Sequence, residues 1–484
     1  MTVTYENQLD LYVNDERLAI ELINIVGKLA LDKSIELVFF KKQLIDANIS
    51  QVIQLHDYAN EVIQSPITVK DVTELAREVL KLELGVSKVD IGKLTHEWLK
   101  QKKSDSSLEI SDFLNQEIGF LICKETTTNV TPKDVILFGF GRIGRLVARE
   151  LIHGRTSGQK LRLRAIVTRS IDAKSLEKRA SLLATDSVHG SFPGTVKVDT
   201  DTNSLIVNGQ RILFIAAKNP AEIDYTRHDI QNALLIDNTG VYRDYTALSA
   251  HKAAKGVSKV ILTAPGKEIP NIVYGINHRN FDVDQVDIFS AASCTTNAIA
   301  PILKVMQDTF KVEAGHIETI HSYTNDQNLL DNMHAKNRRG RSAAVNMVIT
   351  ETGAGKAVVK ILPELQDKLT ANAVRVPTPN GSLAIIQLNI ETATDIDQIK
   401  NTLRKAALHG DLVNQIHYAA SNELVSNDII GNNCCSIFDS NATLVSKNGK
   451  RMVLYVWYDN EFGYSKQVVR LAKYVAKVKR NVYY

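Results

Sequence analysis

Several features that would place this chain in a special class are missing from its sequence. No apolar run reaches the roughly 18 residues that a membrane-spanning helix needs. The first residues, Met1–Glu6, lack a basic stretch followed by an apolar one, so we expect no signal peptide. The net charge is +4 over 484 residues, which is too small to favour nucleic acid or an anionic membrane as a partner.

Cysteine is scarce, and the four in the chain are Cys123, Cys294, Cys434 and Cys435. Their spacing fits neither a disulfide framework nor a set of metal ligands, so we predict no metal site. Few and irregular cysteines favour a reduced, cytoplasmic protein, in which a thiol is free to react. For the vicinal pair Cys434-Cys435 we favour simple burial over redox activity.

Residues 1–129 have helical periodicity. Leu18, Leu22, Ile25 and Leu29 fall on one helix face, and Thr68–Asp71 has the form of a capping box. We therefore predict an additional N-terminal all-α region, with its boundary in 125–132. It is either a small helical bundle packed on the rest of the protein or a regulatory or assembly module, and nothing in it indicates chemistry.

A glycine pattern, G-x-G-x-x-G, follows the short apolar run Val135–Phe138 and precedes a helical pattern. Gly139 permits a tight turn, Gly141 lets a pyrophosphate approach the backbone, and Gly144 lets helix and strand pack closely. We predict a Rossmann dinucleotide-binding domain in residues 130–293. Its turn would bind the cofactor through Gly139, Gly141, Arg142, Ile143 and Gly144, and later strand ends would contribute Thr239 and Thr263.

The end of the second predicted strand bears on which dinucleotide binds. An NAD site places an acidic residue there, on the ribose 2′-hydroxyl. Here the strand ends in Thr168-Arg169-Ser170, and Arg169 with Ser170 suits a 2′-phosphate. We favour NADP over NAD. The alternative is a solvated Arg169, with Asp172 or a loop residue on the ribose.

Cys294 lies where a strand-like run, 286–292, gives way to a helix-like one, 299–306. Unpaired N–H groups at a helix N-terminus stabilise a thiolate and lower a thiol pKa from about 8.5 toward about 7. Taken alone, such a cysteine also fits a buried structural thiol. His321 closes a later strand-like stretch and supplies a general base. A dinucleotide domain joined to a Cys/His pair indicates oxidation of an aldehyde through a thiohemiacetal and a thioester.

Four separated motifs together resemble the phosphorylating glyceraldehyde-3-phosphate dehydrogenases. They are the Gly139 turn, Asp186–Gly190, Ala292–Asn297 and Trp457–Tyr464, and the similarity runs from about Val130 onward. The resemblance implies reversible oxidation of glyceraldehyde 3-phosphate with inorganic phosphate and NAD(P), in glycolysis or gluconeogenesis, by a homotetramer. It does not cover residues 1–129.

The resemblance also implies residue roles, with Cys294 as nucleophile and His321 as its base. The substrate phosphate would bind Thr324, Asp326 and Arg375. Inorganic phosphate would bind Ser293, Thr352, Gly353 and Arg341, with Thr295 beside them. Asn460 would bond the nicotinamide carboxamide, assisted by Tyr464. The run 338–341 also reads as a nucleic-acid patch, but the resemblance places it in a loop between subunits.

The rest of the predicted fold class, α/β, follows from the second half of the chain. Alternating stretches at 384–390 and 451–457 predict an α+β catalytic domain, residues 294–464, with a mainly antiparallel sheet. A helix over about 465–480 is expected to pack back on the cofactor domain.

Some positions depart from the family pattern. Ala298 replaces a second cysteine that many relatives carry, and Glu351 stands beside the expected phosphate site, where it would weaken phosphate binding. Two alternatives therefore stay open: an erythrose 4-phosphate dehydrogenase with water as the acyl acceptor, and an assembly or scaffold protein acting through residues 1–129.

Overall fold

The computed structural model describes residues 4–122, 132–153, 161–478 and 481–484, and these divide into two compact units. The first unit takes residues 4–122, 478 and 481–484, and the second takes residues 132–153 and 161–477. Most of the expected boundary, 125–132, lies outside the described residues. Within the described ranges, no helix combines the length and apolar character needed to cross a bilayer.

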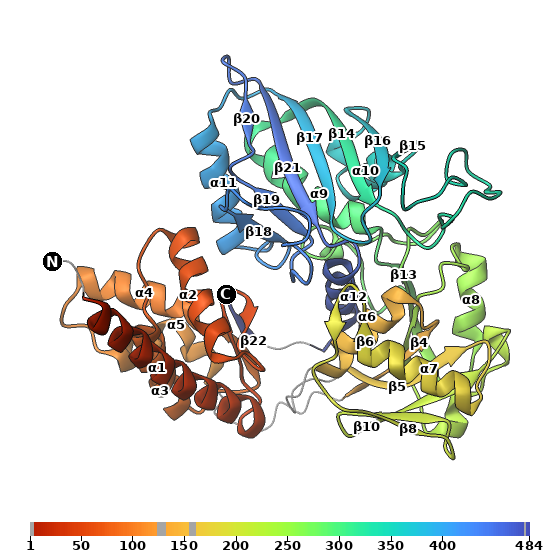
Figure 1. The fold of residues 1–484 in the computed structure, drawn as a ribbon, viewed down its shortest axis with the longest axis horizontal. Helices are drawn as coiled ribbons and strands as arrows, with labels where there is room; N and C mark the ends of the chain where they lie inside the picture. Colours follow the sequence, from red (N-terminus) through yellow and green to blue (C-terminus); the bar gives the residue numbers. More distant parts are fainter. Residues whose placement is uncertain (1–3, 123–131, 154–160, 479–480) are drawn as a thin grey trace. The chain divides into compact units, whose positions relative to one another are not determined.

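In its described residues, the first unit packs five α-helices around a small sheet (Figure 1). The expected capping box is confirmed, since the Thr68 hydroxyl accepts from the Asp71 amide and the Asp71 carboxylate accepts from the Thr68 amide. The helix elements are α1 (Tyr5–Asp32), α2 (Ile49–Ile63), α3 (Val69–Lys81), α4 (Ile91–Ser104), α5 (Ile110–Ile118) and η1 (Gly119–Leu121).

The expectation of an all-α region needs correction, because this unit is α+β. Its sheet has the order β2-β1-β3-β22, with elements β1 (Glu36–Phe39), β2 (Lys42–Gln43), β3 (Ser87–Asp90) and β22 (Asn481–Tyr483). The strands have at most four residues, too few for an alternating pattern to stand out. β22 is also contributed from the far end of the chain, which no local pattern reveals.

The cofactor half of the second unit is built on a sheet of order β13-β12-β11-β4-β5-β10-β9-β8. The strands from β13 to β10 pair in parallel, while β9 pairs antiparallel with both β10 and β8. The strands are β4 (Lys133–Phe138), β5 (Leu161–Thr168), β8 (Val196–Asp199), β9 (Ser204–Val207), β10 (Gln210–Ala216), β11 (Ala233–Asp237), β12 (Val257–Leu262) and β13 (Ile288–Ser290).

This sheet has its switch point between β4 and β11, because the chain leaves β4 toward β5 on one side and returns at β11 on the other. Open parallel sheets bind ligands at the carboxyl ends of the strands beside such a point. The helices and minor elements are α6 (Arg142–His153), α7 (Ala173–Ala184), β6 (Thr185–Asp186), β7 (Gly190–Ser191), η2 (Pro220–Glu222), η3 (Tyr225–His228), α8 (Tyr245–Ala253) and η4 (His278–Asn280).

The catalytic half has a mixed, mainly antiparallel sheet of order β15-β16-β14-β17-β21-β19-β18, with β20 paired to β21. In Figure 1 the strands β21, β17, β14 and β16 run side by side. The strands are β14 (Val312–Ser322), β15 (Val348–Thr350), β16 (Leu369–Val376), β17 (Ser382–Ile390), β18 (Ile416–Ala419), β19 (Ser436–Asp439), β20 (Leu444–Val445) and β21 (Arg451–Tyr458).

Helix α9 (Cys294–Phe310) connects the two halves of this unit and packs on the second sheet. Its apolar side chains, among them Ile299, Leu303 and Met306, are buried in the same core as Ile386 and Leu454 of that sheet. The remaining helices are α10 (Ala354–Ile361), η5 (Pro363–Leu365), α11 (Ile396–Leu408) and α12 (Phe462–Val475), and α12 packs against α6 and α9. The last helix therefore returns to the cofactor half, as expected.

Candidate active site

The proposed nucleophile is placed by a tight turn between β13 and α9. Ala292 has a positive φ of 56°, a conformation that costs a non-glycine residue about 1–2 kcal/mol. The buried hydroxyl of Tyr464 on α12 donates to the Ala292 carbonyl oxygen at 2.8 Å and so holds this turn. Ser293 then caps α9, because its Oγ accepts from the Thr296 amide at 3.0 Å. Cys294 is thereby the first residue of the helix, as its sequence context predicts.

Cys294 and His321 face each other, with 3.6 Å between Sγ and Nε2. Burial raises the pKa of the Cys294 thiol above its ordinary value, and the Arg375 guanidinium opposes this only in part. The expectation that the helix N-terminus would lower this pKa is therefore wrong for the free protein. Burial, together with Arg375, lowers the pKa of His321 to about 3. The free protein holds a neutral thiol beside a neutral imidazole.

The other ring nitrogen of His321 is fixed by its own strand end and by β16. Nδ1 lies 2.7 Å from the Ser322 carbonyl oxygen and 2.8 Å from Arg375 Nη1. If Nδ1–H donates to Ser322, Nε2 carries a free lone pair that faces the thiol, which is the tautomer a base requires. Arg375 Nη1 also donates to the Ser322 carbonyl at 2.7 Å, so it is held beside the pair.

The glycine turn has the clearances that a dinucleotide needs. A Cβ on Gly139, whose φ is +93°, would stand 2.9 Å from Thr239 Cγ2, and one on Gly144 would stand 2.5 Å from the Gly139 oxygen. A Cβ on Gly141 would instead meet open space, so its backbone is open to approach. Tight packing at two glycines and free access at the third fit the pyrophosphate of a nicotinamide dinucleotide, at the N-terminus of α6.

The comparisons with known proteins agree with this geometry. The family model described as glyceraldehyde 3-phosphate dehydrogenase, NAD binding domain, matches residues 133–245, and that of the C-terminal domain matches residues 293–460. A glyceraldehyde-3-phosphate dehydrogenase-like protein of Pseudomonas aeruginosa is 46% identical over 460 residues, covering 94% of this chain and 98% of that protein. The chain belongs to the glyceraldehyde-3-phosphate dehydrogenase family.

Other members of the family match a shorter part of the chain. The glyceraldehyde-3-phosphate dehydrogenase of Neurospora crassa is 39% identical over 341 residues, which are 70% of this chain and 96% of that protein. Glyceraldehyde-3-phosphate dehydrogenase 1 of Bacillus subtilis is 40% identical over 340 residues, or 70% and 97% of the two chains. The Pseudomonas match is longer than the second unit, so it extends into residues 1–131, the region that the resemblance left uncovered.

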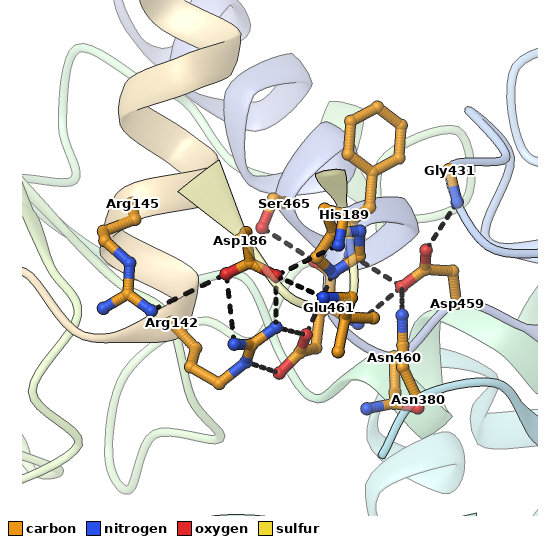
Figure 2. A network of polar contacts seen from close by, with 12 residues as sticks. Arg142, Arg145, Asp186, His189, Asn380, Gly431, Asp459, Asn460, Glu461 and Ser465 are labelled. Atoms are coloured by element: carbon orange, nitrogen blue, oxygen red, sulfur yellow. Dashed lines mark hydrogen bonds and ion pairs between the residues drawn. The ribbon is translucent and has the colours of Figure 1, made fainter. Parts of the chain in front are cut away.

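The side chain of Arg142 is occupied by ion pairs, while its role in binding the cofactor stays a prediction. Its guanidinium donates to both oxygens of Asp186, each at 3.1 Å, and binds the Glu461 carboxylate at 2.5 and 2.6 Å. Figure 2 shows these ion pairs, with His189 on the far side of Glu461 at 2.9 Å and Arg145 beside Asp186. The contacts make Arg142 a positioning residue that ties the glycine turn to the segment before α12.

The carboxylates of this network are held ionised. Although burial acts to raise it, hydrogen bonds from His189 and Arg142 keep the pKa of Glu461 below its ordinary value. Burial is likewise outweighed at Asp186, whose pKa is lowered by the amides of His189 and Val188 and by Arg142. The charges are therefore balanced without any ligand.

Asn460, the residue predicted to bond the nicotinamide carboxamide, directly precedes Glu461 and is buried. Its Oδ1 accepts from the Ser382 hydroxyl at 2.8 Å, which leaves its Nδ2 donors for other partners. The neighbouring Asp459 accepts from the amides of Glu461 and Phe462 and from Asn380, as Figure 2 shows. This turn is thus held by the side chains of Asn380 and Ser382, just before and at the start of β17, and by amides at the start of α12.

The two strand ends predicted to face the cofactor are organised by one buried carboxylate. Asp237 Oδ1 accepts from the amide and hydroxyl of Thr239, both at 2.7 Å, while Thr263 bonds the Asp237 carbonyl oxygen. Asp237 Oδ2 contacts His251 Nε2 of α8 at 2.8 Å, with both side chains fully buried. Neither Asp237 nor His251 was predicted, although Asp237 ends an apolar run directly before Thr239.

Arg169, the residue that bears on cofactor choice, is exposed just beyond β5, the strand next to the glycine turn. Asp172, its possible competitor for the ribose, is occupied as the N-cap of α7, where its Oδ1 accepts from the Ser175 amide at 2.9 Å. Capping does not consume both carboxylate oxygens, but it fixes the side chain at the helix end.

The residues predicted for the substrate phosphate form one cluster. Arg375 Nη1 reaches Thr324 Oγ1 at 3.4 Å, and the Thr324 hydroxyl donates to Asp326. The side chain of Arg339 is only 7% exposed, and its guanidinium donates to Asp326 Oδ2 at 2.6 Å. Two guanidinium groups therefore meet near the Cys294–His321 pair, an arrangement suited to phosphate oxygens.

The residues predicted for inorganic phosphate are less well gathered. Arg341 pairs with Asp331 at 2.7 Å on the surface, with 67% of its side chain exposed. The neighbouring Arg339 donates instead to Thr350 Oγ1, at the end of β15 and close in sequence to Thr352 and Gly353. The structure thus brings Arg339, rather than Arg341, to this side of the cluster. In a run with three arginines, sequence alone gave no sign of which one turns inward.

Two further contacts complete the surroundings of the thiol. Thr295 Oγ1 lies 4.0 Å from Cys294 Sγ and 3.2 Å from the Tyr458 hydroxyl, and both side chains are buried. The Tyr458 ring packs edge-on to His321 with 5.8 Å between centroids. Tyr458 was not among the predicted site residues, although it lies in the recognised motif 457–464. As expected, Cys434 and Cys435 are buried, and Cys294, Cys434 and Cys435 are free thiols.

Proposed function

We propose that this chain is a phosphorylating, reversible glyceraldehyde 3-phosphate dehydrogenase that prefers NADP. The observation that carries the proposal is the Cys294–His321 pair at 3.6 Å, with the Arg375 guanidinium held beside the imidazole by its bond to the Ser322 carbonyl oxygen. A reactive thiol, a base and an anion-binding guanidinium in one place are what oxidation of a phosphorylated aldehyde requires.

The residues then act in the following order. Cys294 Sγ attacks the aldehyde carbon while His321 Nε2 takes the thiol proton. His321 then gives this proton to the carbonyl oxygen, which becomes the thiohemiacetal hydroxyl, and the imidazole is neutral again. His321 next accepts the proton of that hydroxyl as a hydride leaves the same carbon. The glycine turn and Asn460 would hold a nicotinamide cofactor, which would supply the hydride acceptor. The thioester that remains is attacked by inorganic phosphate, which releases the acyl phosphate and the Cys294 thiolate.

The charge pattern supports this assignment. Because the free pair is neutral, an incoming phosphate dianion meets Arg375 and Arg339 with only Asp326 to offset them. A bound anion near Arg375 reduces the pull of that guanidinium on the imidazole, so His321 becomes a stronger base when substrate is present. The proton transfer is thus favoured with substrate in place.

A direct assay tests the reaction. Initial rates of cofactor reduction with glyceraldehyde 3-phosphate should depend on added phosphate, and the product should be an acyl phosphate trapped by hydroxylamine. Equal turnover without phosphate would rule out the phosphorylating reaction. It would favour the second candidate, an erythrose 4-phosphate dehydrogenase with water as acceptor, for which the exposed Glu351 beside Thr352 is the supporting observation. The ratio of kcat/KM for the two sugars then decides.

Cofactor preference has its own test at Arg169. Replacing Arg169 with Asp removes the cation expected at the 2′-phosphate and adds a carboxylate for the ribose hydroxyl. We expect the ratio of kcat/KM for NADP to that for NAD to fall by about tenfold or more, since a charge-assisted contact contributes about 1.5–3 kcal/mol. Arg162, half exposed at the other end of β5, is the matched control. An unchanged ratio in Arg169→Asp would show that this side chain does not read the 2′ position.

We further propose a cytoplasmic homotetramer. The loop between β14 and β15 exposes several large apolar side chains, which favours burial against other copies of the chain. They are Leu329, Leu330, Met333, Val345 and Met347. Light scattering coupled to gel filtration measures the subunit count, and a monomer at micromolar concentration would contradict the tetramer.

A further inference from the structure

The first unit holds a segment from the other end of the sequence as part of its sheet. Asn481, Val482 and Tyr483 of β22 lie parallel to β3 in register with Ser87, Lys88 and Val89. In the order β2-β1-β3-β22, β22 is an edge strand and β3 an inner one. Without the segment, β3 would expose an unpaired row of main-chain groups.

One side chain of the segment is anchored, and its surroundings are specific. Tyr483 is 8% exposed, and its hydroxyl donates to Glu117 Oε2 of α5 at 3.0 Å. Lys93 of α4 stands over the Tyr483 ring at 5.6 Å from the centroid, and its ammonium donates to the main-chain oxygen of Tyr484. A buried aromatic ring with a paired hydroxyl and a cation on its face makes a built pocket.

The side chain of Tyr484 is also contacted by the first unit, whereas those of Asn481 and Val482 are not specifically bound. Lys88 of β3 lies over the Tyr484 ring at 6.0 Å and is itself paired with Glu36 at 3.0 Å. Asn481 and Val482 are exposed and contribute chiefly their backbone. Main-chain pairing provides affinity and the two tyrosines provide selectivity, which is how domains bind peptides by adding a strand to a sheet.

We propose that residues 4–122 form a peptide-binding module whose ligand is an extended segment containing Tyr-Tyr, supplied here by residues 481–484 of the same chain. The pocket is formed by β3, α4 and α5, with Lys93 and Glu117 as its recognition residues. Because the segment follows α12 in the sequence, its binding joins the module to the catalytic unit by a second connection, in addition to the chain at 123–131. This inference does not rest on the proposed function.

The test is a full-length protein lacking only residues 481–484. Hydrogen–deuterium exchange of the β3 amides, 87–90, should rise at least about tenfold, because one side of the strand loses its partner. Exchange in α6 of the catalytic unit serves as the internal control and should not change. A fluorescein-labelled peptide with the sequence of residues 479–484 should bind the truncated protein saturably and restore the slow exchange of β3.

Selectivity is tested with the same peptide carrying alanine at the position of Tyr483, which should bind at least about tenfold more weakly. The intact protein should bind the unaltered peptide poorly, since its own segment fills the pocket. Equal binding of the two peptides, or no binding of either, would overturn the proposal. So would unchanged β3 exchange after truncation.

A second pair of variants covers the case in which truncation unfolds the module. In the otherwise intact chain, Tyr483→Ala should raise exchange at 87–90 markedly and Tyr483→Phe only slightly, because Phe keeps the ring and loses the bond to Glu117. Asn481→Ala, at an exposed position, is the control and should leave exchange unchanged. If Tyr483→Ala behaves like Asn481→Ala, the tyrosine is not an anchor and the module does not select this segment.

Discussion

Two polar clusters in the second unit differ in how their titratable groups are charged. Around Arg142, a guanidinium and two ionised carboxylates form ion pairs, and His189 bonds one of these carboxylates, all without a ligand. Around Cys294, burial keeps both the thiol and the imidazole of His321 neutral, while Arg375 beside them carries charge. The charges of the first cluster are paired without a ligand. In the second cluster, an arriving anion would give Arg375 a partner of opposite charge. The Arg142 cluster therefore stabilises the fold, whereas the Cys294 cluster is arranged to bind an anionic substrate.

The largest difference between the clusters should appear when the nucleophile is removed. Cys294→Ser replaces the thiol by a poor nucleophile, and we expect kcat/KM to fall on the order of 10⁴-fold or more with no change in unfolding free energy beyond experimental error. Steady-state kinetics and urea denaturation measure the two. Cys434→Ser is the control at a free thiol away from His321. A loss of activity below tenfold in Cys294→Ser would mean that the thiol is not the attacking atom.

Removing the base should have the next largest effect. His321→Asn keeps a polar group near the Ser322 carbonyl but cannot accept the thiol proton, so we expect kcat to fall about 10²–10⁴-fold. KM should change much less, since Arg375 and Arg339 remain. His316, half-buried on the same strand, supplies the control variant His316→Asn. Comparable losses in both variants would point to a general effect on β14 instead of proton transfer.

A substitution in the Arg142 cluster should lower the stability of the protein. Glu461→Gln removes the carboxylate that binds both Arg142 and His189 and leaves Arg142 with Asp186 alone, so we expect the free energy of unfolding to fall by about 1–3 kcal/mol. Because the folded pKa of Glu461 lies below its ordinary value, its contribution is present above the unfolded pKa and is lost as the pH falls through the folded one. Urea denaturation at neutral and acidic pH should therefore show the variant and parent converging in acid. Asp308→Asn, in an exposed pair with Lys304, should cost less than about 0.5 kcal/mol.

The smallest expected effect concerns the protonation of the thiol. In the free protein, the rate of Cys294 alkylation by iodoacetamide should rise with pH and reach half its maximum above the ordinary thiol pKa, since burial favours the neutral form. Arg375→Met should move this midpoint higher still, because the guanidinium stabilises the thiolate. Mass spectrometry of the peptide containing Cys294 follows the rate. A midpoint near pH 7 in the unmodified protein would instead mean that the helix N-terminus outweighs burial.

Features that are set by a few adjacent residues could be predicted from the sequence. The capping box at Thr68 and the glycine turn at 139–144 are each set by a few adjacent residues, and both form as predicted. The thiol pKa was judged from the adjoining helix alone, whereas burial by residues far along the chain decides its direction.

The misplaced details all involve contacts between distant segments. Arg142 meets Glu461 more than 300 residues later, and β22 pairs with a strand nearly 400 residues earlier. The choice between Arg339 and Arg341 depends on how the loop folds back onto Asp326, which spacing does not determine. Patterns therefore locate the reacting groups well but leave open which neighbours hold them.

The turn at Ala292 has a consequence for how the protein is made. Its strained backbone is held by the hydroxyl of Tyr464, which is translated 172 positions after the carbonyl it binds. A ribosome releases the sequence of the thiol long before it releases the residue that secures the thiol's position. During synthesis Cys294 is consequently present without its finished surroundings, and its reactivity is set only when the last helix of the catalytic unit docks.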